Sequence, residues 1–203
     1  MKNWLTMLIF SAIISSFFVG CALFGNTMCD QQLRIQRCAD TPELSWATSI
    51  AIVTEDMIGR RVVTCDIATI LHRGFDCCEN EDQCIRNAHP LEVHQILRDD
   101  LFLDTEFVPA IPSYPKIKRL LQSRQYLVLV AHDGIDYRFY VISGYHDYAR
   151  SLYVINPLKK DMTWRIDGHW VTERSTDILL YDQMRNSWLG KFVGLFIVRG
   201  PQR

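Results

Sequence analysis

The sequence predicts an α+β protein with a helical N-terminal half and a β-rich C-terminal half, divided near residues 104–114. Apolar residues recur at helical spacing before that boundary. Runs of β-branched and aromatic residues, separated by turn signals, follow it. No segment of the chain repeats another. With 48% hydrophobic and 22% charged residues over 203 positions, the composition supports a sizeable core.

Four helices are expected, three before this boundary and one just after it. The longest runs from Ser45 to about Ile58, with Pro42 just before it and Gly59 just after it. Its apolar side chains fall at helical spacing: Trp46, Ile50, Val53 and Met57. Shorter helices are expected at 66–71, 91–97 and 116–121, and the last two each follow a proline. Residues 74–87 are expected to form a loop held by cysteines.

The C-terminal half is expected to hold four strands, at 125–131, 137–145, 152–155 and 192–198. The Asp133-Gly134 turn and the loop after Gly144 connect the first three as hairpins.

The first twenty residues resemble an export signal. Lys2 precedes a run, residues 4–19, that carries no charge, and a small residue, Gly20, stands directly before Cys21. This arrangement resembles a bacterial lipobox, in which Cys21 would be lipidated. We therefore expect a lipoprotein-type signal peptide at 1–20, a tether at 21–35 and a folded domain at 36–203. An ordinary signal peptide or an uncleaved anchor is the alternative, and each version exports the rest of the chain.

The net charge indicates which class of partner the protein is not expected to bind. A formal net charge of -1 gives no electrostatic reason to expect nucleic acid as a partner.

Besides Cys21, six cysteines form an even set, as expected for disulfides in an oxidising compartment: Cys29, Cys38, Cys65, Cys77, Cys78 and Cys84. The adjacent Cys77 and Cys78 are expected to bond different partners, with Cys65 and Cys84 as candidates. A zinc site with His89 is the alternative, but the spacing fits no standard zinc motif. No metal or cofactor is expected.

Several motifs follow one another in a recognisable order. They are Leu44-Ser45-Trp46-Ala47-Thr48-Ser49, Thr64-Cys65-Asp66-Ile67-Ala68, Gly74-Phe75-Asp76-Cys77-Cys78 with Cys84, Arg138-Phe139-Tyr140-Val141-Ile142-Ser143-Gly144-Tyr145, and Asn156-Pro157. Over about residues 33–185 this order resembles bacterial secreted papain-like cysteine peptidases. The resemblance implies a two-lobed fold, with a helical N-terminal lobe, an antiparallel β-rich C-terminal lobe and a cleft between them.

The resemblance also places a catalytic triad, and the residues at its positions differ from the family's. The family uses a thiolate activated by an imidazole, which an Asn or Asp orients. Here those three positions hold Ser45, Arg138 and Asn156. Arginine stays protonated and cannot accept a proton from Ser45. Gln36, the candidate oxyanion residue, lies nine positions before Ser45, where the family has about six. We therefore expect an inactive homologue.

The expected function is binding of a peptide or protein segment in the former cleft, by a lipoprotein attached to the bacterial cell envelope through its lipid. Trp46 and Arg138 are the candidate binding residues. The structural alternatives place Trp46 in the core and pair Arg138 with Asp136 or Asp147.

Three other hypotheses stay open. An active hydrolase could use Ser45 with His132 or His146, since a general base needs only hydrogen-bond reach. Cys38 could serve as a displaced nucleophile. A purely structural envelope protein would not use the cleft at all.

Overall fold

A computed structural model of the chain describes residues 28–30, 41–73, 75–157, 162–166, 169–173 and 176–201. The expected signal peptide, Cys21, Gln36 and Cys38 lie outside the described residues. Within them, helices pack against an antiparallel sheet, which confirms the α+β class.

The central helix α2 spans Ser45–Ile58, as the sequence predicts. Pro42 opens a short 3-10 turn, η1 (Pro42–Leu44), that leads into the helix. Gly59 ends it in the left-handed conformation (φ 69°) that glycine adopts without strain.

The other helices are shorter. They are α3 (Thr64–Leu71), η2 (Glu81–Cys84), α4 (Pro90–Gln95), η3 (Ile96–Asp100), which continues α4 as a π turn, α5 (Tyr114–Gln122) and η4 (Tyr181–Gln183).

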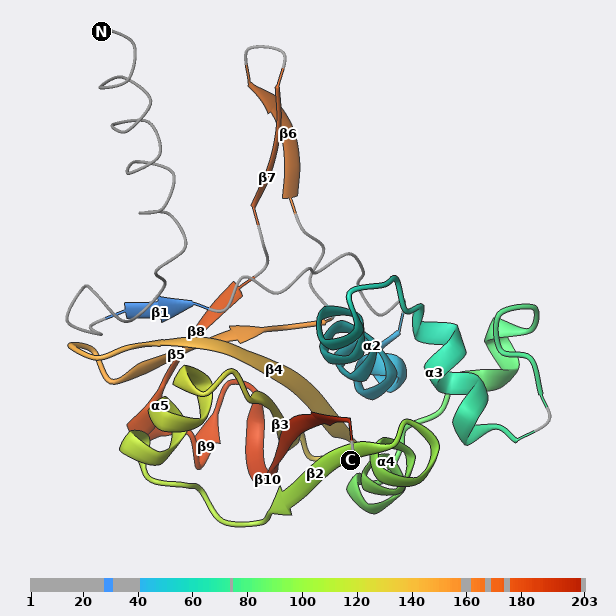
Figure 1. Cartoon of the computed structure of the whole chain (residues 1–203), viewed down its shortest axis with the longest axis horizontal. Coiled ribbons are helices and arrows are strands. Elements are labelled where there is room, and N and C mark those ends of the chain that lie inside the picture. The colour runs from blue at the N-terminus through green and yellow to red at the C-terminus, as the bar shows by residue number, and fades with distance from the viewer. Residues whose placement is uncertain are drawn as a thin grey trace, which may run out of the picture.

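The main sheet has the strand order β2-β10-β3-β4-β5-β8. Its strands are β2 (Leu103–Val108), β3 (Tyr126–His132), β4 (Tyr137–His146), β5 (Ser151–Ile155), β8 (Thr176–Leu180) and β10 (Gly190–Pro201). The short strands β1 (Met28–Asp30) and β9 (Asn186–Ser187) pair with β4 and β10. A separate hairpin, β6 (Met162–Ile166) and β7 (His169–Glu173), projects from this sheet (Figure 1).

The structure differs from the sequence analysis in two places. It adds strands β2, β8 and β9 and the β6–β7 hairpin, none of which the sequence analysis predicted. It also pairs Met28–Asp30, inside the segment expected to be a tether, with the C-terminal end of β4.

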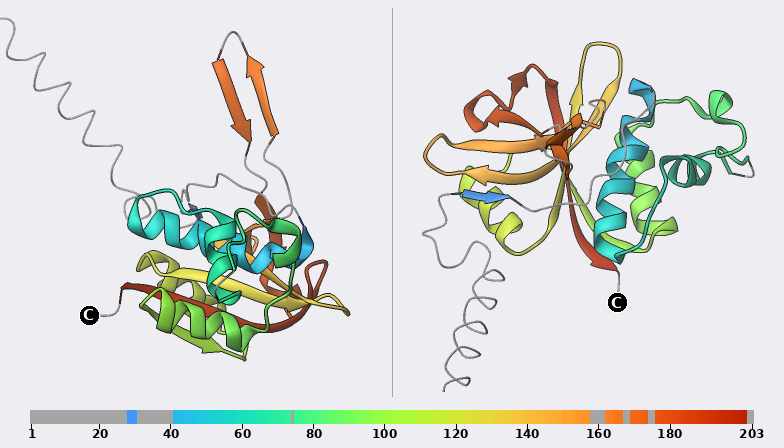
Figure 2. Two further views of the ribbon diagram at one scale, coloured as in Figure 1. Left: turned by 90° about the vertical axis from the view of Figure 1, so that its right-hand side faces the viewer. Right: turned by 90° about the horizontal axis from the view of Figure 1, so that it is seen from above.

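Two hydrophobic cores flank the sheet. The α2-side core contains Phe139 and Val141 of β4 together with buried residues of α2, α3 and α4. The α5-side core contains Tyr140 and Ile142 of the same strand together with Ile117 and Leu121 of α5. Figure 2 shows α2, α3 and α4 grouped on one side and α5 on the other. Because alternate residues of a strand point to opposite faces, β4 contributes to both cores.

Two disulfides hold the segment after α2. Cys65 bonds Cys78, and Cys77 bonds Cys84. The adjacent cysteines therefore reach different partners, as the sequence predicts. Within the described part of the chain, no helix has the length and apolar character needed to cross a membrane.

Candidate functional site

Ser45 begins α2 and is enclosed by the fold. The residue has 0% of its surface exposed. Its hydroxyl is buried and has no hydrogen-bond partner among the described residues. Its backbone N–H donates to the carbonyl of Pro42 within the turn that leads into the helix. Both groups that an acyl-transfer site would need, a reachable nucleophile and a free oxyanion donor, are therefore absent at Ser45 in this arrangement.

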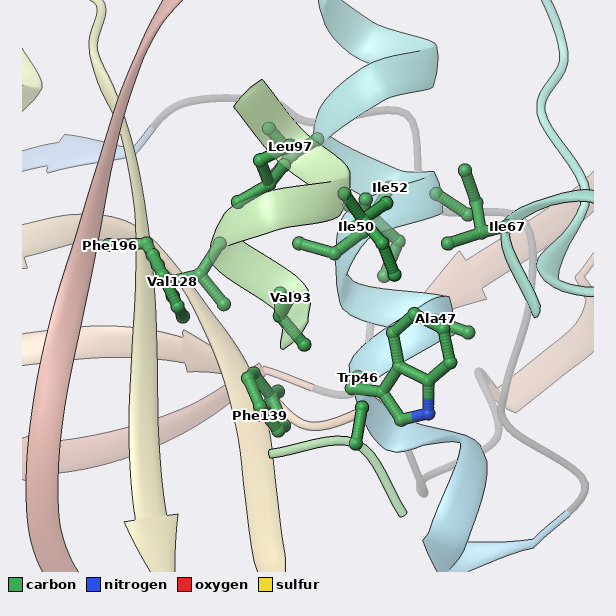
Figure 3. Close-up of a cluster of buried hydrophobic side chains, with 14 of the residues drawn as sticks. Trp46, Ala47, Ile50, Ile52, Ile67, Val93, Leu97, Val128, Phe139 and Phe196 are labelled. Carbon is green, nitrogen blue, oxygen red and sulfur yellow. The ribbon is translucent and has the colours of Figure 1, made fainter. Parts of the chain in front are cut away.

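The start of α2 nevertheless lies beside the start of β4. The Ser49 hydroxyl donates to the carbonyl of Phe139 at 2.9 Å. Because residues four apart share one face of a helix, Ser45 lies one turn earlier on the same face. Figure 3 shows Trp46 and Phe139 together at this end of the α2-side core. Helix α2 is therefore packed against strand β4.

Trp46 is a core residue. Its side chain is fully buried, and its indole N–H donates to the carbonyl of Arg86 at 3.0 Å. That bond satisfies the one polar atom of the ring and ties α2 to the segment before α4. The structure thus supports the core interpretation of Trp46, and the residue presents no surface to a ligand.

Arg138 lies on the face of the sheet opposite to α2. Phe139 packs in the α2-side core, whereas Tyr140 packs in the α5-side core. Strand alternation places Arg138 on the Tyr140 face, away from α2. It pairs with Ala131 of β3, which also belongs to the α5-side core.

Two carboxylates hold the Arg138 guanidinium. Its Nε donates to Asp133 at 2.8 Å, and its Nη2 lies 3.6 Å from Asp136. Burial alone would raise the pKa of Asp133, but the N–H groups of Asp136 and Ile135, with the Arg138 charge, lower it below its usual value. Asp147 is not a partner of this guanidinium, because it pairs with Lys118. Arg138 therefore fixes the β3–β4 turn.

Asn156 follows the end of β5 and is 9% exposed. The register pairs Ile155 with Val141, so Asn156 lies next to Tyr140, near the start of β4. Arg138 and Asn156 thus come to the same end of the sheet. Ser45 approaches that end from the opposite face, and no hydrogen bond joins it to Arg138 among the described residues.

Three rings gather on the α2 side of this end, and the sequence analysis did not group them. Tyr137 packs against the α2-side core, with the His89 and His132 rings each 5.1 Å from its ring centre, edge-on. His89 also begins α4 in a capping box with Glu92. The one signal in sequence was that cap, because Pro90 and Glu92 follow the histidine at the expected spacing.

The two candidate bases differ in position. His132 pairs with Tyr137 in register and so lies at the start of β4. His146 ends the strand, seven residues beyond Phe139, which corresponds to about 23 Å along a strand. Only His132 lies at the end of β4 where α2 begins.

Neither a protein-family model nor a curated protein sequence matches this chain.

Proposed function

We propose that this protein is an exported lipoprotein whose domain keeps a papain-like peptidase scaffold without hydrolysis and binds a peptide or protein segment. The observation that carries the proposal is the state of Ser45, the residue at the nucleophile position. Its hydroxyl is buried without a partner among the described residues, and its N–H is used by Pro42.

The scaffold part of the proposal is supported by the packing of α2 on β4 and by the two disulfides. The loss of catalysis is supported by Arg138, which carries a permanent charge and is held by Asp133 and Asp136 on the far face. Arg138 cannot accept a proton, and its charge is already paired with two carboxylates, although its Nη1 is buried without a hydrogen-bond partner among the described residues.

The binding surface is expected around the three rings, because Trp46 and Arg138 are not available to a ligand. Next to His89, the side chain of Leu91 is 64% exposed. In the turn before Tyr137, Ile135 is 84% exposed. We call His89, Leu91, His132, Ile135 and Tyr137 the α2-start surface. Exposed apolar and aromatic side chains at one edge are typical of peptide and protein recognition.

The test uses the full chain in detergent. It is treated with a fluorophosphonate probe and a thiol-directed epoxide, and adducts are located by mass spectrometry while a mixed peptide library is incubated alongside. We expect no adduct at Ser45 and no cleavage. Labelling of Ser45 that disappears in His132→Gln, together with cleavage, would establish a serine hydrolase instead.

Binding is tested on an immobilised peptide library with two matched variants. Ile135→Ser changes the α2-start surface, whereas Ile178→Ser changes an isoleucine of β8 that is also well exposed (61%). We expect Ile135→Ser to weaken peptide retention at least about tenfold and Ile178→Ser to leave it unchanged. Equal retention by both variants and by the parent chain would place binding elsewhere or favour a structural role.

A further inference from the structure

The two disulfides and His72 form a compact corner beside α3. Cys77 and Cys84 are each 1% exposed, whereas Cys78 lies at the surface. His72 follows α3 directly, and one of its ring nitrogens and the sulfur atoms of Cys77 and Cys84 all lie within 4.8 Å of one another. In the sequence, His89 was the imidazole of the alternative zinc site with this cysteine cluster, but in the structure His89 lies against Tyr137.

The His72 imidazole has an unexplained nitrogen. Its Nε2 is buried and has no hydrogen-bond partner among the described residues. A buried polar atom without a partner costs about 1–3 kcal/mol, so proteins rarely keep one without a use. A ligand held between the imidazole and the neighbouring sulfurs would provide that use.

A hollow lies beside His72 at the same corner. A hollow of about 350 Å³ is lined by His72, Arg73, Phe75 and Gln83. His72 is common to the hollow and to the sulfur cluster, so the hollow borders the residue that faces the two sulfurs.

We propose that reduction of the Cys77–Cys84 disulfide turns this corner into a binding site for a zinc-class divalent ion, with His72, Cys77 and Cys84 as ligands. Two molecules of a thiol reductant, RSH, convert the disulfide into two cysteine thiols and leave as RSSR. The ion then displaces the two thiol protons and binds both thiolates and the neutral imidazole. This ligand set of two sulfurs and one nitrogen leaves a fourth position for water from the hollow.

The neighbouring Cys65–Cys78 pair is the less suitable set. Its third potential ligand is the Asp66 carboxylate, with the Cys78 sulfur 3.4 Å from an Asp66 oxygen. Asp66 and Cys78 are both exposed, so water competes for the ion there. A buried set with two thiolates and an imidazole holds zinc more strongly than an exposed set with a carboxylate.

The experiment measures zinc bound by the full chain in detergent, before and after reduction with a phosphine that does not retain the metal. Bound zinc is released and quantified with a chromogenic chelator, and cobalt(II) substitution reports thiolate ligands by its absorption bands. We expect one additional equivalent of zinc after reduction. His72→Ala should weaken binding at least about tenfold, and His89→Ala should leave it unchanged.

Two cysteine variants complete the test. Cys65→Ser/Cys78→Ser keeps the proposed ligands and should retain the zinc, whereas Cys77→Ser/Cys84→Ser should lose it. No extra zinc in the reduced chain would overturn the proposal. Equal losses in His72→Ala and His89→Ala would also overturn it, because a reduced and unfolded chain would bind zinc without distinguishing the two histidines.

Discussion

The two buried serines of α2 occupy equivalent faces of the helix but differ in bonding. Ser49 donates its hydroxyl to Phe139, whereas the Ser45 hydroxyl has no partner among the described residues. Ser49→Ala should therefore lower the free energy of unfolding by about 1–3 kcal/mol. Ser45→Ala should leave it unchanged or raise it, because a buried unpaired hydroxyl is removed. Urea unfolding of the two variants checks this. A comparable loss in Ser45→Ala would show that its hydroxyl has a partner after all.

Buried tyrosines set the behaviour of the protein in alkali. Burial raises the pKa of Tyr140 to about 12, and Asp133 and Asp177 add to the effect while Arg138 opposes it. In the unfolded chain a tyrosine loses its proton near pH 10. Between about pH 10 and 12 the folded state therefore binds the extra proton, so the free energy of unfolding falls as pH rises.

Tyr140→Phe should flatten that alkaline decline, since phenylalanine does not titrate. Urea unfolding of parent and variant across this pH range measures the difference and cancels the contribution of other groups. Parallel declines in the two proteins would mean that the Tyr140 phenol is not protected in the folded state.

At the scale of elements, local signals decided what could be predicted. The bounds of α2 follow from Pro42, Gly59 and the apolar residues at helical spacing between them, whereas that spacing did not predict that every residue from Ser45 to Glu55 is buried. Strand β2 was missed because its sequence, Leu-Asp-Thr-Glu-Phe-Val, alternates apolar and polar residues weakly, and its pairing with β10 is almost a hundred residues away in the chain. Such pairings depend on tertiary contacts that no local pattern contains.

The candidate site shows the same limit. A linear motif places Arg138 at the family's histidine position, but the face on which a residue lies depends on strand register, and a shift of one residue reverses it. The gathering of His89, His132 and Tyr137 likewise requires α4 to pack on the start of β4. Neither could be obtained from sequence spacing.

The packing of β10 beside its neighbour β2 depends on a glycine. A Cβ at Gly194 would lie 2.2 Å from the Phe107 ring, far inside contact distance. Gly194→Ala should therefore lower the free energy of unfolding by about 1–3 kcal/mol. Adding Phe107→Leu should recover part of that loss, because the smaller side chain frees the space. Thermal or urea unfolding of the single and double variants tests this, and a double variant that is simply additive would contradict the proposed clash.

At the scale of the whole molecule, one sheet carries both hydrophobic cores. Val128 and Val130 of β3 belong to the α2-side core, while Leu127 and Leu129 of the same strand belong to the α5-side core. The same strands form one side of each core, so disrupting the strands in one core also disrupts the other. The described fold should therefore unfold as one cooperative unit. A two-lobed protein with separable cores would not.

This difference gives a direct test. Ile50→Ala removes a fully buried side chain from the α2-side core, and Leu121→Ala removes one from the α5-side core. Each should cost about 2–5 kcal/mol and shift a single urea transition. Hydrogen exchange of α2 and of α5 should report the same destabilisation in both variants, with the disulfides left intact. If each variant instead loosens only its own helix, or two transitions separate, the cores are independent lobes, and a ligand bound between them could move one against the other.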